Sequence, residues 1–226
     1  KADWVYCTYN YAFNENNEVV VQHVKPRFFL KGTVKWQKSV HEDAVATKQV
    51  SQVKDSSFLT EPLFVNHQNV YNEVKIKEKA IRNLGILLKE YQKDGDKTDL
   101  RTLQNIGMTH IAAGDFKNAI EFLLKHYRGT GAKEDKFWSL TKVAFCLEML
   151  GQYDAAINTL LEALKIIPRW STAYFGLAGV YSHLQDYGKV IEWTNMGLTK
   201  RYPDTLNMIQ PRDYDLNPLG RMADAY

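Results

Sequence analysis

The sequence predicts an α+β chain, a β-rich region followed by an all-α solenoid of tandem repeats. Residues 1–70 are rich in aromatic and β-branched residues separated by turn-forming stretches. From residue 71 the apolar spacing changes to that of a helix, which predicts a linking helix over residues 71–96. Within residues 97–226 a helical hairpin of nearly constant length then recurs three times, the signature of a repeat architecture.

The bulk composition is that of an ordinary globular protein. The chain has 226 residues, of which 45% are hydrophobic and 24% charged, and its formal net charge is +3. This charge is too small and too evenly mixed to indicate nucleic-acid binding, and no run approaches the ~18 apolar residues of a membrane span. Cys7 and Cys146 have no metal-ligand spacing and no signal peptide is visible, so we expect free thiols and a cytoplasmic location.

The first strand pair is predicted from residues 4–24. Residues 4–13 alternate partly and are rich in aromatic side chains, and residues 18–24 form a second apolar run. Residues 14–17, Asn-Glu-Asn-Asn, supply turn chemistry between them. The segment is therefore predicted to be a β-hairpin.

The rest of the β-rich region is predicted in shorter pieces. Pro26 interrupts the second strand, and residues 27–30 form a separate short apolar run. Residues 33–36 predict a third strand, residues 43–57 a polar loop, and residues 58–70 an extended segment. Three side chains of that segment are predicted to be buried: Leu63, Phe64 and Val65.

The linking helix is predicted from an apolar stripe that ends near Asp94-Gly95-Asp96. The stripe consists of Val74, Ile76, Ala80, Ile81, Leu84, Leu87 and Leu88.

The repeats share one pattern of apolar and small residues. The predicted first helices carry Leu103-x-x-Ile106-Gly107, Leu140-x-x-Val143-Ala144 and Tyr174-x-x-Leu177-Ala178. The predicted second helices place Ala119, Ala156 and Val190 where the two helices cross. The small residues of the first helices are 37 and 34 positions apart, so the pattern resembles the tetratricopeptide repeat of ~34 residues.

A fourth copy of the first-helix pattern stands at Leu219-x-x-Met222-Ala223-x-x-Tyr226. No second helix follows it, which leaves its apolar face without a partner. We therefore expect truncation or disorder beyond Tyr226, although a natural C-terminus there is the alternative.

Stacked repeats form a concave surface that commonly binds peptides. The first-helix residues predicted to line it are Arg101, Gln104, Met108, Trp138, Thr141, Phe145, Thr172, Phe175 and Gly179. Family members that clamp a C-terminal carboxylate use Lys, Asn and Arg at such positions. The corresponding residues here are Gln104, Met108, Lys142, Thr172 and Gly176, so that clamp is absent. The alternative for the aromatic residues is packing against neighbouring helices or the first region.

Four short motifs of the chain occur in a particular order. They are residues 25–30 (Lys-Pro-Arg-Phe-Phe-Leu), residues 34–36 (Val-Lys-Trp), residues 40–42 (Val-His-Glu) and residues 82–84 (Arg-Asn-Leu). In this order they resemble the end of the catalytic domain of GT-A-type family 2 glycosyltransferases that carry tetratricopeptide repeats behind that domain. The resemblance implies that residues 1–70 are the C-terminal part of such a domain. The parent protein would transfer a sugar from a nucleoside diphosphate donor to a peptide, protein or glycan acceptor.

The resemblance also implies roles for individual residues. Such transfer commonly uses a divalent cation, Mg²⁺ or Mn²⁺, to stabilise the diphosphate, and a base for the acceptor. His41 suits the metal or diphosphate role, or is a loop histidine, and Glu42 is either the base or structural. Arg27 reaches phosphate or forms an ion pair that anchors its strand, and Trp36 stacks on a sugar ring or packs in the core.

An Asp-x-Asp metal motif is also expected in such an enzyme. Asp94-Gly95-Asp96 and Asp213-Tyr214-Asp215 have the spacing but lie in a helix-ending turn and in a repeat insertion, so neither is predicted to bind metal. The motif would then lie upstream of Lys1, and the chain alone would be inactive. The rival hypothesis is a non-catalytic repeat scaffold for protein–protein interaction, and in either case the solenoid could support a homo-oligomer.

Overall fold

The structure is a computed structural model. It describes residues 4–14, 16–37, 43–47, 57–58, 64–66, 72–201, 203, 214 and 216–225. The chain forms two compact units, a β unit of Lys1–Asn72 with Thr205–Pro211, and a helical unit of Glu73–Asp204 with Arg212–Tyr226.

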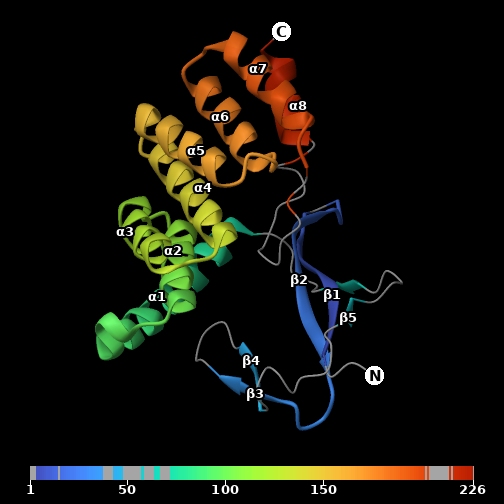
Figure 1. Cartoon of the computed structure of the whole chain (residues 1–226), viewed down its shortest axis with the longest axis vertical. Helices are drawn as coiled ribbons and strands as arrows, with labels where there is room; N and C mark the ends of the chain where they lie inside the picture. The colour runs from blue at the N-terminus through green and yellow to red at the C-terminus, as the bar shows by residue number, and fades with distance from the viewer. Residues whose placement is uncertain are drawn as a thin grey trace. The chain divides into compact units, whose positions relative to one another are not determined.

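The β unit is built on the predicted hairpin. Strand β1 (Trp4–Phe13) pairs antiparallel with β2 (Val19–Phe29), as Figure 1 shows. The side chain of Asn14 closes the turn, because its Oδ1 accepts hydrogen bonds from the backbone N of Asn16 at 3.0 Å and of Glu18 at 2.9 Å. The hairpin prediction is confirmed, and its cause is local turn chemistry.

Strand β2 is longer than predicted, because Pro26 does not interrupt it. The residue pairs with Tyr6, and the register of the two strands shifts between Val5 and Tyr6. Among the described strands β2 pairs only with β1, so it is an edge strand. Prolines in sheets occur at edge strands and bulges, and Pro26 lies on an edge strand beside a register shift.

The opposite edge of β1 pairs with two short parallel strands, β5 (Ser57–Phe58) and β6 (Phe64–Asn66). Two strands that follow β2, β3 (Val34–Gln37) and β4 (Asp43–Ala46), form a separate antiparallel pair. The predicted loop over residues 43–57 is therefore wrong at β4. A short strand of this kind is decided by its partner rather than by its own periodicity.

The two faces of β1 have different chemistry. Cys7 and Tyr9 are buried on one face, and Val21 of β2 is buried with them. On the other face Asn10 is buried and bonded across the sheet: its Nδ2 donates to Asn66 Oδ1 at 2.7 Å, and its Oδ1 accepts from Gln22 Nε2 at 2.8 Å. Of the predicted buried residues of the extended segment, Val65 is half-buried, while Leu63 and the Phe64 side chain lie outside what the structure describes.

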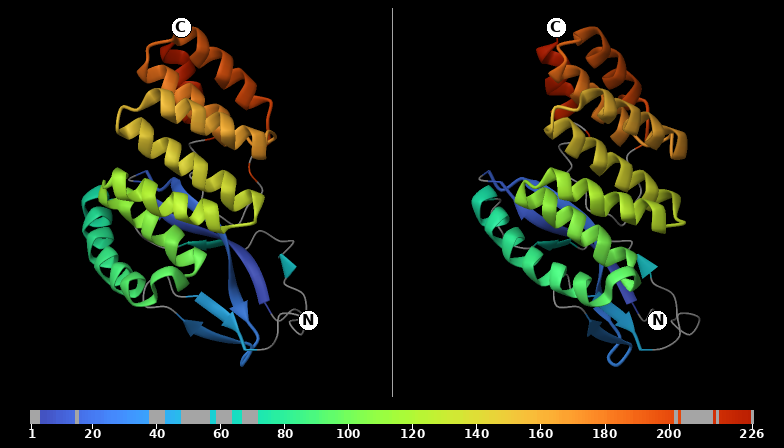
Figure 2. Two further views of the ribbon diagram at one scale, coloured as in Figure 1. Left: turned by 60° about the vertical axis from the view of Figure 1, so that its left-hand side comes forward. Right: turned by 90° about the vertical axis from the view of Figure 1, so that its left-hand side faces the viewer.

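The helical unit contains eight α-helices and one 3₁₀ turn among its described residues. In chain order they are α1 (Glu73–Asp94), η2 (Gly95–Lys97), α2 (Leu100–Ala113), α3 (Phe116–Gly129), α4 (Lys133–Met149), α5 (Tyr153–Ile166), α6 (Thr172–His183), α7 (Tyr187–Leu198) and α8 (Leu216–Asp224). Consecutive helices stack side by side along the unit, as both views in Figure 2 show. The predicted linking helix and three helical hairpins are all present.

The turn of each helical hairpin contains one residue with a positive φ angle. Gly114 and Gly151 take positive φ angles of 83° and 71°, and Gln185 takes 58° at the equivalent place of the third hairpin. Asp115 and Asp186 then cap the second helices, accepting from backbone N–H groups at 3.3 and 3.2 Å. The left-handed residue ends the first helix of each hairpin, and an acid caps the second helix in the first and third hairpins, whereas Gln152 begins α5 without a side-chain cap.

Small residues allow the paired helices to approach closely. A Cβ at Gly107 would lie 2.8 Å from Cγ of Leu123, and Ala119, Ala156 and Val190 are fully buried. The predicted crossing positions are therefore correct. In the linking helix, by contrast, Ala80 and Leu87 of the predicted stripe are buried, but Val74 and Ile81 are 67% and 57% exposed.

Candidate functional site

The first helices α2, α4 and α6 carry the surface predicted to bind a partner. Of the predicted residues, Arg101, Met108 and Phe145 are exposed, whereas Gln104 and Thr172 are half-buried. The remaining ones are buried: Trp138, Thr141, Phe175 and Gly179. Whether any of them contacts a partner stays a prediction.

The buried aromatic residues have internal neighbours that account for their position. The ring of Phe175 lies over Gly197 of α7, which has no Cβ to block it, and its centroid is 6.4 Å from that of Tyr214. The Lys142 ammonium stands 5.4 Å from the centroid of Trp138. The alternative of packing against neighbouring helices therefore describes Phe175 well.

An exposed apolar surface remains at the middle and end of the first helices. Met108 and Phe145 occupy equivalent positions of adjacent repeats and are 36% and 40% exposed. The Phe145 ring makes an edge contact with Phe116 of α3, with centroids 6.1 Å apart. Met149, one turn after Phe145, is 51% exposed. We call Met108, Phe145 and Met149 the apolar surface. Met149 lies four residues after Phe145, on the same side of the helix, and this spacing could have predicted it from the sequence.

A charged cluster joins three first helices beside this surface. Glu148 of α4 is largely buried, and its Oε1 lies 3.2 Å from Nε2 of His183 on α6. Burial raises the pKa of Glu148, and the charges of His183 and Arg221 oppose that shift. Arg221 of α8 also donates to the carbonyl O of Phe175 at 3.4 Å. Gly179 leaves room for the guanidinium, since a Cβ there would lie 3.1 Å from Nη1 of Arg221. No spacing in the sequence predicted this cluster. Through Arg221 it holds α8 against α6.

The candidate catalytic residues of the β unit are only partly described. Arg27 lies in β2 near the register shift, and nothing is described of its side chain. Trp36 is 54% exposed on β3, with its ring 5.8 Å from that of Phe29 in an edge contact. His41 and Glu42 lie between the paired residues of β3 and β4 in sequence, outside the described residues.

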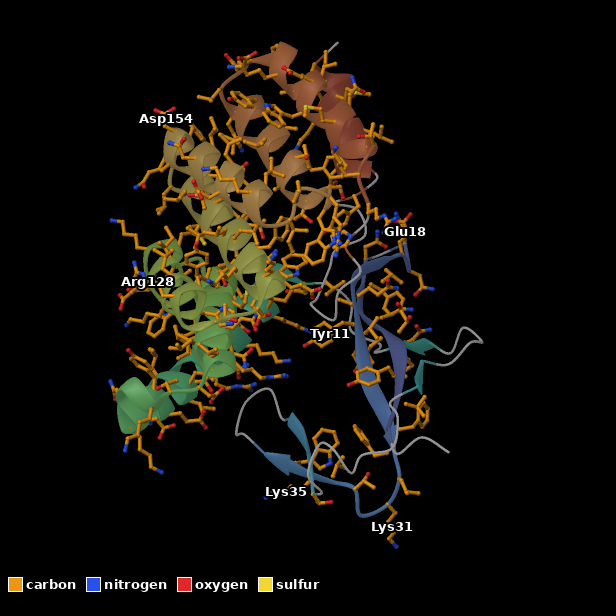
Figure 3. All side chains as sticks on the ribbon, viewed as in Figure 1. Tyr11, Glu18, Lys31, Lys35, Arg128 and Asp154 are labelled. Carbon is orange, nitrogen blue, oxygen red and sulfur yellow. The ribbon has the colours of Figure 1, made fainter. Side chains whose placement is uncertain are left out.

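Two lysines accompany Trp36 on this part of the β unit. Lys35 precedes it on β3 and Lys31 lies in the turn before that strand, and both side chains extend into solvent (Figure 3). Within the described parts of the chain, no three His, Cys, Asp or Glu side chains gather as a metal site would require. The fit of His41 and Glu42 to a divalent cation is therefore not tested.

Comparisons with known proteins agree with the helical architecture. The family model described as tetratricopeptide repeat matches residues 100–125 and 139–169. The crystal structure of MamA matches with a TM-score of 0.50 and 21% identity, covering 67% of this chain and 80% of that chain. Kinesin light chain-like TPR repeats from Podosopora anserina match with a TM-score of 0.50 and 15% identity, covering 68% of this chain and 82% of that one.

These findings establish tetratricopeptide repeats in the helical unit, and the structural likenesses show the fold alone. No curated protein matches the chain. None of the comparisons supports the glycosyltransferase resemblance. No α-helix among the described residues is long and apolar enough to cross a membrane.

Proposed function

We propose that the helical unit is a protein-interaction module that binds a protein segment through its apolar surface. The observation that carries the proposal is the exposure of Phe145, a large aromatic side chain near the C-terminal end of α4 whose ring is held against Phe116 of α3. Aromatic residues supply a disproportionate share of binding energy at protein interfaces, and methionine adapts to varied apolar partners. Tetratricopeptide repeats, which the chain contains, serve as interaction scaffolds in many proteins.

The chemistry of the surface narrows the kind of segment that it suits. Of the five positions that would clamp a terminal carboxylate, only Lys142 holds a cation, and the other four hold Gln104, Met108, Thr172 and Gly176. We therefore propose that the partner is an internal segment anchored by apolar side chains, rather than a free C-terminus.

Peptide selection on the whole chain tests this function. Displayed random peptides should be enriched for apolar anchors, and Phe145→Ser should weaken the selected peptides by roughly tenfold or more, the effect of removing one hot-spot side chain. Leu161→Ser on α5 is the control, since Leu161 is 37% exposed outside the apolar surface. Selected peptides that bind both variants as well as the wild type would rule out this surface.

The second candidate is that the β unit is the end of a GT-A-type glycosyltransferase domain, with the repeats positioning an acceptor. It is supported by the resemblance of the β2 and β3 segments and by one observation, the exposed Trp36 of β3. An exposed indole can stack on a sugar ring. We propose Arg27 and Trp36 as donor-binding residues, Glu42 as the base or acceptor-orienting group, and His41 as the ligand of a divalent cation. When bound, Mg²⁺ or Mn²⁺ would stabilise the charge on the diphosphate.

Metal-dependent hydrolysis of nucleotide-sugars by the full-length parent protein tests the second candidate. His41→Ala should abolish the dependence on Mg²⁺ or Mn²⁺, and Trp36→Ala should raise KM for the donor. Hydrolysis and metal dependence that are unchanged in His41→Ala would show that the site assignment is wrong. The cytoplasmic location is proposed with either function, on the buried thiol of Cys146, which forms no disulfide.

A further inference from the structure

Helix α1 carries a row of cations along its outer side. At 3.6 residues per turn, five of its basic residues lie within about 80° of the helix circumference and extend over about 27 Å of its length. We call these residues the basic stripe: Lys75, Lys79, Arg82, Lys89 and Lys93. All five are exposed. Ala80 and Leu87, on the opposite side of the helix, are buried, and α1 packs against α2.

No acid interrupts the basic stripe. Glu78 and Glu90 border it on its two sides, and within the described parts of the chain neither carboxylate forms an ion pair. Neighbours three or four residues apart in the stripe carry the same charge, as Lys75 and Lys79 do, and Lys89 and Lys93. Such like-charged pairs destabilise a helix. An anionic surface bound along the stripe would relieve this repulsion.

Surface cations of the later second helices are arranged differently. Nζ of Lys125 on α3 lies 2.7 Å from Oε1 of Glu121, and Nζ of Lys165 on α5 lies 2.6 Å from Oε1 of Glu162. Charges of alternating sign are typical of a helix face that contacts only solvent. The basic stripe departs from this arrangement along almost the whole of α1, which indicates an anionic partner.

Three features favour a lipid surface among anionic partners. A single helix is convex, so all five cations can meet a flat surface at once. Ile86 stands within the stripe, between Arg82 and Lys89, and is 37% exposed, while Val74 and Ile81 on the adjoining side are 67% and 57% exposed. Apolar side chains beside cations suit the boundary between headgroups and acyl chains. Four of the five cations are lysines, which act as flexible point charges rather than as rigid forks for single phosphates.

We propose that the basic stripe of α1 docks the chain on an anionic lipid surface. The cations meet the headgroups, and Ile86 contacts the apolar boundary beneath them. The attachment is peripheral and depends on salt, because it is made mainly by exposed charges. It goes beyond the proposed function, since α1 carries none of the residues of the apolar surface and the partner is lipid rather than protein.

Cosedimentation of the whole chain with vesicles tests the proposal. Vesicles of about one-third phosphatidylserine in phosphatidylcholine should bind the chain at about 0.1 M salt and release it at about 1 M, where the Debye length falls from about 10 Å to about 3 Å. Vesicles of phosphatidylcholine alone should bind it far less. The triple substitution Lys79→Ala, Arg82→Ala and Lys89→Ala should lower the partition constant roughly a hundredfold, because each cation near a charged membrane contributes about fivefold.

The matched control removes the same number of cations from other helices. Lys117→Ala, Arg128→Ala and Lys165→Ala together alter exposed residues of α3 and α5, and this variant should bind like the wild type. Three outcomes would each overturn the proposal: no binding to the anionic vesicles at about 0.1 M salt, equal binding to neutral vesicles, or equal weakening by the two triple substitutions. Binding to polyglutamate or duplex DNA without binding to vesicles would also overturn it, and would point to an acidic protein segment or a nucleic acid.

Circular dichroism establishes that the variants fold, which we expect because the altered residues are exposed and alanine favours a helix. If the α1 variant unfolds, Lys89→Ala with Lys93→Ala replaces it, and the expected loss is then roughly thirtyfold.

Discussion

Gly197→Ala sets two opposing effects against each other in one helix. Replacing glycine by alanine inside a helix ordinarily stabilises a protein, by at most ~1 kcal/mol. At Gly197, however, the new Cβ would lie 2.7 Å from Cδ1 and 3.2 Å from Cζ of Phe175, and closer still to Cε1. Phe175 is only 5% exposed, so its ring has little space into which to move.

The expected sign follows from the two magnitudes. Adding a methyl group to a filled core costs about 1–3 kcal/mol, which exceeds the gain in helix propensity. We expect Gly197→Ala to lower the free energy of unfolding by roughly 1–2 kcal/mol, or the melting temperature by about 3–6 °C. Gly188→Ala in the first turn of α7 is the matched control, because the nearest atom to its new Cβ is an ordinary 3.7 Å away.

Thermal melts followed by circular dichroism measure the sign of the stability change for each variant. Gly188→Ala should be neutral or stabilising and Gly197→Ala destabilising, and Phe175→Leu should remove most of the Gly197→Ala penalty in a double-mutant cycle. A Gly197→Ala variant that melts at or above the wild-type temperature would refute the packing described for α6 and α7.

Three further outcomes are expected in the helical unit. Burial lowers the pKa of His126 from its ordinary 6.5, so the unfolded chain binds a proton at this histidine more readily than the folded chain does. The contribution of neutral His126 to the free energy of unfolding is therefore complete above pH 6.5. It is lost as the pH falls from 6.5 through the lowered pKa of the folded state. Melts on both sides of pH 6.5 should show this loss, and His126→Asn, which can still bond Ser139, should reduce it. Burial raises the pKa of Cys146 to about 12, so a thiol reagent should modify it only as the chain unfolds, and rapid labelling in native buffer would contradict that. Gln185→Gly should stabilise the chain by about 0.5–1 kcal/mol, because Gln185 holds the positive φ that Gly151 holds in the preceding hairpin; an unchanged urea midpoint would contradict the expected strain.

The candidate sites were predictable to different degrees. Met108 and Phe145 follow from their place in the repeat pattern, and both are exposed as a binding surface requires. Gly179 has the equivalent place in the third repeat but is buried, because the Arg221 side chain of α8 lies against it. The position of a residue within the repeat therefore predicts on which side of its helix the residue lies. Whether the residue is exposed depends on the side chains of the neighbouring helix.

The sequence by itself determined the repeats and the hairpin of the β unit. Apolar spacing, small crossing residues and turn chemistry are encoded within a few tens of residues, so the helices, their turns and the β1–β2 pair follow from local rules. Only the tertiary structure decided that β4 pairs with β3, that Glu148, His183 and Arg221 meet, and that Val74 and Ile81 of the linking helix are exposed. These features depend on partners distant in sequence, whose presence or absence no local pattern records.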